Sequence, residues 1–402
     1  MTEAVGQRKV ARRGAIFGAM FLMATSAIGP GFITQTTTFT VQLGAAFAFA
    51  ILASTLVDIA VQLNVWRVIG VSGERAQDLA RSVNPAAGVL LSLLIVSGGL
   101  VFNIGNVAGT GLGVKAALGV DIRVGAVVSA LFAVGIFVVK RAGAALDKAV
   151  VFLGALMIVL TAYIAVASGP DLGVAARNTI APETVDLFAI TTLIGGTVGG
   201  YMTYAGAHRL LDSGVSGVES VRRISHGSVQ GVIITGVMRV LLFLAILGVV
   251  QSGADLGVEN PTASAFGAAA GDIGRLLFGV IFWAAAMTSV IGASFTSVTF
   301  LTRRTTSART TTAITVGFIA LSLVLFLVLG KAPVTLLIFA GAFNGMVLPL
   351  GFTVILYVAW RRRDLLQGYR YPTWLLGIGV AVWLLTLYLG WNALTGIADL
   401  WR

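Results

Sequence analysis

Runs of about 20 apolar residues, each long enough to cross the hydrocarbon core of a bilayer, recur along this chain from end to end. They cover residues 14–41, 44–66, 88–113, 122–139, 149–168, 186–206, 228–250, 274–301, 310–330, 332–360 and 373–396. Hydrophobic residues make up 57% of the sequence and charged residues only 11%, whereas soluble domains are about 25% charged. Because backbone polar groups in lipid must be satisfied within the chain, runs of this length form helices. The sequence therefore predicts an all-α polytopic membrane protein with 11 transmembrane helices.

The first apolar run follows a basic stretch, as the apolar core of a signal peptide does. It continues past Val41 without a small-residue cleavage pattern, so we interpret it as a retained transmembrane span. The sequence has no cysteine, which excludes disulfides, thiolate metal sites and cysteine nucleophiles. No linker rich in proline, serine or charge separates the runs, and we expect a single membrane domain.

Lysine and arginine are concentrated in alternate connecting segments. If the N-terminus is inside, 20 of the 27 basic residues lie on the cytoplasmic side, six lie outside and Arg239 lies within a span. Basic residues accumulate in cytoplasmic loops, so the sequence predicts a multi-pass protein of the cell membrane with a cytoplasmic N-terminus and an external C-terminus. The net charge of +11 then belongs to a face that lies against anionic lipid. The expected partner is the lipid bilayer, and no nucleic acid is required.

Two of the predicted spans contain residues that interrupt a helix. The first span contains Gly29-Pro30-Gly31, and the sixth has four glycines between Gly195 and Gly200. Proline removes a backbone donor and glycine adds flexibility, and broken backbone in lipid is tolerated only where it lines a cavity. Glycines can instead allow close helix packing, which fits those of the third and tenth spans. A proline between two glycines, however, contributes nothing to packing that alanine would not.

The two interrupted spans are five spans apart. Breaks at matching positions of two five-span halves are typical of secondary transporters built from inverted repeats, in which the unwound backbone holds the substrate. We therefore divide the chain into a basic cytoplasmic tail (1–13), a first five-helix repeat (14–185), a second, inverted repeat (186–360), and a basic cytoplasmic loop with the eleventh helix (361–402). The expected mechanism is alternating access to a substrate site at the breaks.

Four motifs, in this order and spacing, resemble those of the NRAMP metal-ion transporters. They are GPGF at 29–32, WRVIGVSGERAQDLAR after the second span, NIGNVAGTGLGV in the third span and AAAMTSVIGASFTSV in the eighth. The resemblance extends over nearly the whole chain. It implies a leucine-transporter-type fold, in which two inverted five-helix repeats are followed by one further helix.

The residues that bind metal in the family it resembles are replaced here. Family members that move manganese and iron carry Asp-Pro-Gly-Asn in the first span, Met-Pro-His in the sixth, an acidic pair in the third and a glutamine in the tenth. The matching positions are Gly29 and Phe32, then Gly199, Gly200 and Tyr201, then Asn103 and Asn106, and finally Ala342. A divalent cation needs oxygen, nitrogen or sulfur donors and usually some negative charge. We therefore predict no bound metal and no cofactor, and a bare Mn²⁺ or Fe²⁺ site is disfavoured.

The sequence favours a small organic substrate with a carboxylate, either an anion or a zwitterion. Helix N-termini at a break present free N–H groups and a partial positive charge. The candidate substrate-binding residues are Gly29, Pro30, Gly31, Phe32, Gln35, Thr36, Thr197, Gly199, Gly200, Tyr201, Asn103, Asn106 and Asn344. Phe32 and Tyr201 would form apolar or stacking walls. A threonine hydroxyl in a membrane helix usually bonds back to its own backbone, so each threonine has a structural alternative.

Other functions stay open at the level of sequence. A hydrated, magnesium-like ion could bind through waters to Asn103, Asn106 and Asn344, because Mg²⁺ dehydrates reluctantly. A sensor that binds a ligand without moving it is a further alternative, although the basic tail gives no signalling domain to support it. An enzyme is not expected, since no nucleophile, base and orienting group recur together.

Three titratable residues are candidates for coupling or gating. Asp58 and Arg239 are the charged residues expected within the membrane, in spans that are again five apart. An unpaired charge near the bilayer centre costs at least about 2.5–3.5 kcal/mol, so the two residues form either a structural ion pair, which we favour, or a coupling site for a proton or sodium ion. His208 is expected at the cytoplasmic edge of the sixth span, where a histidine is usually solvated, and its ordinary titration range suits a proton relay.

Overall fold

The computed structural model describes residues 28–138, 142–303 and 305–400, and this part of the chain consists of helices and short connecting segments. The helices are α2 (Pro30–Leu43), α3 (Phe47–Ser72), α4 (Ala76–Val83), α5 (Pro85–Leu118), α6 (Ile122–Val138), α7 (Ala142–Ala167), α8 (Leu172–Ile180), α9 (Leu187–Thr197), α10 (Met202–Asp212), α11 (Val221–Gln251), α12 (Pro261–Leu301), α13 (Ala308–Leu329), α14 (Pro333–Arg361) and α15 (Thr373–Leu400). Two short 3-10 helices, η1 (Gly44–Ala46) and η2 (Val218–Ser220), precede α3 and α11. The basic tail and most of the first apolar run lie outside the described residues.

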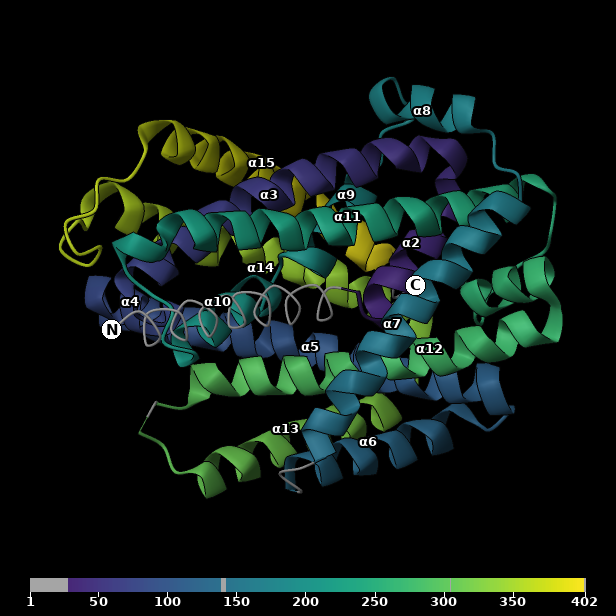
Figure 1. Ribbon diagram of the computed structural model, residues 1–402, viewed down its shortest axis with the longest axis horizontal. Helices are drawn as coiled ribbons and strands as arrows, with labels where there is room; N and C mark the ends of the chain where they lie inside the picture. The colour runs from purple at the N-terminus through teal and green to yellow at the C-terminus, as the bar shows by residue number, and fades with distance from the viewer. Residues whose placement is uncertain (1–27, 139–141, 304, 401–402) are drawn as a thin grey trace, which may run out of the picture.

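Most of the long helices lie along the longest axis of the molecule, and α7 crosses them obliquely (Figure 1). One end of the bundle, which we call the α4 end, contains α4, the C-terminal part of α10, the described residues between α12 and α13 (302–303 and 305–307) and the segment 362–372, whereas α8 lies at the opposite end. Contacts between distant segments close the α4 end. The backbone N–H of Gly217 donates to the Gly70 carbonyl at 2.8 Å, and the Arg362 guanidinium donates to the Ser82 carbonyl at 2.8 Å. The predicted cytoplasmic loops that the structure describes therefore share one end of the bundle.

Seven helical segments of the described chain are long and apolar enough to cross a membrane, and the bent pair formed by α7 and α8 would add an eighth. One of the seven segments consists of α2 and α3 joined through η1. Helix α6 is too short to be counted among the seven, and α9 and α10 are the two halves of one predicted span. The number of 11 spans therefore stays a prediction. Some helices exceed their apolar runs: α11 begins at Val221 rather than at residue 228, and α12 at Pro261 rather than at 274. Polar and small residues continue these helices beyond the apolar core, with a kink in α12 at Gly271.

Both predicted interruptions are present as helix ends. Helix α2 begins at Pro30, whose fixed φ and missing N–H suit the first position of a helix, and Gly29 before it is extended, with φ −102° and ψ −173°. In the sixth predicted span, α9 ends at Thr197 and α10 begins at Met202. Gly200 between them has a φ of +55°, a conformation that glycine adopts at little cost. The first break is described from its α2 side, since the description of the chain begins at residue 28.

Close approach of backbones holds the broken sixth span against its neighbours. A Cβ atom on Gly195 of α9 would collide with the carbonyl of Gly341 in α14. Helices α5 and α12 approach each other in the same way: a Cβ atom on Gly113 of α5 would lie 2.6 Å from the Trp283 backbone nitrogen of α12. These glycines therefore have the packing role that small residues take at membrane helix interfaces.

Candidate substrate site at two helix breaks

The two breaks lie beside the same aromatic ring, that of Phe102 on α5. A Cβ atom built on Gly31 would be 3.1 Å from this ring, and the Tyr201 ring meets it edge to face with the centroids 6.0 Å apart. Both rings are buried. The first turn of α2 and the residue that precedes α10 therefore both lie against Phe102.

Gln35 reaches the second break from α2. Its Nε2 donates to the Leu337 carbonyl of α14 at 3.0 Å, which fixes the orientation of the amide. Its Oε1 lies against Gly196 of α9 and has no hydrogen-bond partner within the described chain. The side chain is fully buried, so this oxygen is an acceptor held at the break and left unused.

Asn344 approaches the same break from α14. Its Nδ2 donates to the carbonyls of Gly98 and Ala340 at 3.0 Å and 2.9 Å. Its Oδ1 lies against Gly200, the residue with positive φ, and no described group bonds to it. Asn344 and Gln35 therefore present two amide oxygens to the backbone of the broken span.

Three further buried side chains near Phe102 have unused hydrogen-bonding atoms. The amide of Asn106 lies beside the Tyr201 hydroxyl, but neither group makes a hydrogen bond of normal geometry in the described structure. The Ser297 hydroxyl lies against Gly99 and is also without a partner there. Nearly all buried polar atoms in proteins are hydrogen-bonded, so the unused atoms of this cluster are available to a ligand or to water.

Sequence reasoning missed two members of this site. Phe102 is one of 22 phenylalanines, and nothing in the sequence distinguishes it as the ring between the breaks. Ser297 lies within the AAAMTSVIGASFTSV motif. The motif identified the eighth span, but it did not show which way the Ser297 hydroxyl points.

Two predicted substrate residues direct their polar atoms elsewhere. The Thr36 hydroxyl donates to the Phe32 carbonyl at 2.7 Å, which is the structural alternative expected for a threonine in a membrane helix. Asn103 donates from Nδ2 to Ser294 at 3.2 Å and to Ser322 at 3.0 Å. Asn103 therefore faces α12 and α13 rather than the breaks.

The charged residues Asp58 on α3 and Arg239 on α11 each contact one break. Asp58 accepts a hydrogen bond from the hydroxyl of Thr197, the last residue of α9, at 2.6 Å. The guanidinium carbon of Arg239 lies 4.2 Å from the ring centroid of Phe32, in the first turn of α2. This places Thr197, a predicted substrate residue, in a bond to Asp58.

Asp58 and Arg239 lie close enough to interact electrostatically. The direct ion pair that the sequence favoured is not formed. Within the described structure, no nitrogen of the Arg239 guanidinium lies within 4.0 Å of an Asp58 carboxylate oxygen. Asp58 Oδ1 and Arg239 Nε and Nη2 are buried without hydrogen-bond partners in the described chain. Each charge is instead turned toward a broken helix.

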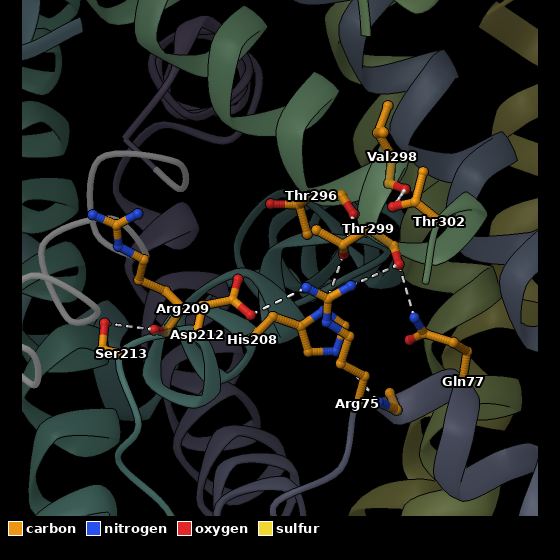
Figure 2. Close-up of polar contacts among 11 residues, drawn as sticks. Arg75, Gln77, His208, Arg209, Asp212, Ser213, Thr296, Val298, Thr299 and Thr302 are labelled. Atoms are coloured by element: carbon orange, nitrogen blue, oxygen red, sulfur yellow. Dashed lines mark hydrogen bonds and ion pairs between the residues drawn. The ribbon is translucent and has the colours of Figure 1, made fainter. Parts of the chain in front are cut away.

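His208 on α10 is buried, with 1% of its surface exposed, so the expectation of a solvated histidine at the edge of the span was wrong. The ring accepts a hydrogen bond at Nε2 from the Ala76 N–H at 3.3 Å, and its Nδ1 lies 3.1 Å from the Thr299 hydroxyl (Figure 2). These residues belong to α4 and α12, which fold over the end of α10. The second histidine, His226, is exposed, as expected.

The side chains at the breaks are mostly neutral amides and hydroxyls, with the carboxylate of Asp58 and the guanidinium of Arg239 beside them. Within the described residues, no three or more His, Asp or Glu side chains come together in a way that could hold a metal ion. Gly29 and Phe32 stand where the resemblance placed an acid and an amide, and neither supplies a side-chain donor. The described side chains at the breaks therefore offer hydrogen-bonding groups rather than a cluster of acidic or histidine ligands.

A helical membrane bundle with one interrupted helix, a second helix that begins at a Gly-Pro-Gly sequence and unsatisfied polar atoms beside both is typical of a class of proteins, the secondary transporters with a leucine-transporter-type fold. Solved structures of this class superimpose on the chain. The Eremococcus coleocola manganese transporter, in complex with an aromatic bis-isothiourea substituted compound, gives a TM-score of 0.74 at 17% identity, covering 96% of this chain and 86% of that one. MhsT in complex with L-phenylalanine gives a TM-score of 0.66 at 16% identity, covering 94% of this chain and 98% of that one.

The family follows from the sequence comparisons. The family model described as "Natural resistance-associated macrophage protein-like" (Nramp) matches residues 20–395. The chain is also 46% identical over 388 residues to the "Uncharacterized membrane protein YcsG" of Bacillus subtilis (strain 168), with 96% of each chain covered. The chain belongs to the Nramp family, and it is a multi-pass secondary transporter.

Proposed function

We propose that this chain moves a small organic solute with a carboxylate group, an anion or a zwitterion, across the cell membrane by alternating access. The observation that carries the proposal is that two helix N-termini, at Pro30 and Met202, lie on either side of the Phe102 ring, among amides and hydroxyls with unused hydrogen-bonding atoms. The first N–H groups of a helix have no partner within the regular helix; in α10 those of Met202 and Tyr204 donate to the carbonyls of Gly199 and Tyr201, whereas in α2 the first bond is from Ile33 to Gly29. Each N-terminus also has a partial positive charge of about half an elementary charge. A carboxylate satisfies both the donors and the charge.

The side chains at the breaks suit the rest of such a solute. The Gln35 and Asn344 oxygens can accept hydrogen bonds from an ammonium group or an amide, while the Asn106 amide and Tyr201 hydroxyl can donate. A hydrogen bond to a charged group contributes about 1.5–3 kcal/mol. The ring of Phe102 supplies an apolar wall between the breaks.

Asp58 and Arg239 support coupling to a proton or a sodium ion. Asp58 is bonded to the end of α9, and Arg239 covers the start of α2, so a change in the charge of Asp58 would act on both broken helices. The basic α4 end then faces the cytoplasm, with the N-terminus on the same side.

A divalent ion is the second candidate substrate. One structural neighbour is a manganese transporter, and a hydrated Mg²⁺ could be held through waters by Asn106, Asn344 and backbone carbonyls. The positive helix ends at Pro30 and Met202 oppose a cation, and the negative end of α9 at Thr197 offsets this at the second break only. The acidic group described nearby, Asp58, is bonded to Thr197. The organic solute is therefore the better match.

Thermal-shift screening of the purified protein tests the proposal. Small carboxylates and zwitterions are compared with Mn²⁺ and Mg²⁺, since a ligand that binds the folded state raises its apparent melting temperature. We expect stabilisation by members of the organic panel, followed by uptake of the same compound into proteoliposomes. Stabilisation and uptake of a divalent ion alone would overturn the proposal.

A matched pair of variants locates the binding site. Asn344→Ala should weaken the shift caused by the organic ligand. Asn392→Ala on α15 removes an amide with the same bond to the carbonyl four residues earlier, at 2.8 Å, and should leave the shift unchanged. Equal effects of the two variants would place the binding site away from the breaks.

A further inference from the structure

The start of α4 ties the inner half of the broken span to α12. Arg75 forms an ion pair with Asp212 at 3.1 Å and also donates to the Thr299 carbonyl at 3.4 Å. Gln77 donates to the same carbonyl at 2.8 Å. Together with the Ala76 N–H bond to His208, these contacts join α4, α10 and α12 at one point (Figure 2).

The hydrogen-bond partners of His208 fix its tautomer. The Thr299 hydroxyl donates its single hydrogen to the Thr296 carbonyl at 2.6 Å, so towards His208 it acts as an acceptor and Nδ1 must carry a proton. The backbone N–H of Ala76 is a donor, so Nε2 must present its lone pair. These two contacts therefore require a neutral ring with the proton on Nδ1.

We propose that His208 is a proton-operated latch, closed when the ring is neutral and released when Nε2 takes a proton from the α4 side. A second ring proton would place two N–H donors against each other across 3.3 Å. The Ala76 bond would be lost, and a positive charge would appear beside Arg75. Release would free the end of α10 from α4 and α12. The latch rests on the proposed alternating access, in which α10 is one moving half of a broken helix.

A polar cavity lies beside the latch and is lined by residues that contact His208 or its neighbours, but not by His208 itself. It has a volume of about 380 Å³ and is lined by Arg75, Asp212, Thr299, Thr302, Arg303 and Thr306, among others. The charged and titratable groups on the described elements around His208 are Glu74 and Arg75 before α4, Asp78 and Arg81 of α4, Tyr204, Arg209 and Asp212 of α10, and Arg303 after α12. Basic groups outnumber acidic ones there, so an added positive charge disfavours the closed arrangement.

The latch can be tested without any substrate by measuring the distance between spin labels on two introduced cysteines. The chain has no cysteine of its own, and Ser213→Cys and Thr305→Cys place spin labels on exposed positions after α10 and α12. We expect a longer distance at about pH 5 than at about pH 8, the range in which histidine changes charge. His208→Gln keeps an acceptor for Ala76 but gains no proton, so it should hold the short distance at both pH values.

The second histidine supplies the matched control. His226→Gln should keep the full pH response of the distance, and it leaves His208 as the one histidine, because the chain has two. Nitrogen NMR of this variant with labelled histidine should show a neutral ring protonated at Nδ1 near pH 8, and this measurement applies even if His208→Gln does not fold. A ring protonated at Nε2, or an unchanged distance while His208 titrates, would overturn the latch. An intact pH response without organic transport would overturn only the proposed function.

Discussion

Replacing Gly200 with alanine tests whether the second break is built around Asn344. Gly200 has a φ of +55°, and the left-handed conformation costs an ordinary residue about 1–2 kcal/mol. A Cβ atom at this position would also collide with the Asn344 amide oxygen. The variant therefore combines a backbone penalty with the displacement of one side chain of the proposed site.

The size of the second effect follows from the bonds of Asn344. Moving the amide sacrifices its hydrogen bonds to the carbonyls of Gly98 and Ala340, each of which contributes about 0.5–1.5 kcal/mol. Their loss adds about 1–3 kcal/mol to the backbone penalty. Gly214→Ala is the matched control, because Gly214 has a φ of +72° and no atom within 4 Å of the added Cβ. It measures the backbone penalty alone.

The assay compares apparent melting temperatures in detergent with uptake of the substrate identified by screening. Gly200→Ala should melt at a lower temperature than Gly214→Ala and should lose uptake, whereas Gly214→Ala should retain it. Equal melting temperatures with normal uptake by both variants would refute the close contact between Gly200 and Asn344 and its role in binding.

Three further predictions concern the breaks and the buried charges. Changing Gly29 and Gly31 to alanine and Pro30 to leucine should favour a continuous helix, giving a folded protein without uptake; normal uptake would mean that the break is only a packing feature. Asp58→Asn and Arg239→Gln should each lower the melting temperature, because one buried charge loses its counter-charge. The double variant should lose less than the sum, and additive losses would indicate separate roles. Calorimetry should detect no micromolar Mn²⁺ binding at the breaks, and binding abolished by substitutions confined to them would contradict the site assignment.

The sequence by itself determined where helices form and where two of them end. The length of an apolar run requires a helix in lipid, and a proline with glycines on both sides cannot continue one. Helix α2 accordingly begins at Pro30, and Gly200 separates α9 from α10. The concentration of basic residues in alternate loops can likewise be seen in the sequence alone. In the structure, loops of this set lie together at the α4 end. These features depend on neighbouring residues and on the surrounding lipid.

Only the tertiary structure decided which polar atoms face the breaks. Asn103 and Asn106 are three residues apart on α5, yet the partners of Asn103 lie 191 and 219 residues away, while the amide of Asn106 is left beside Tyr201. His208 is buried by α4 and α12, through contacts that span 132 and 91 residues. The physical reason is that a helix apolar on all sides has no amphipathic pattern to set its rotation. That rotation comes from packing against other helices, and it decides whether a side chain reaches the substrate, another helix or the lipid.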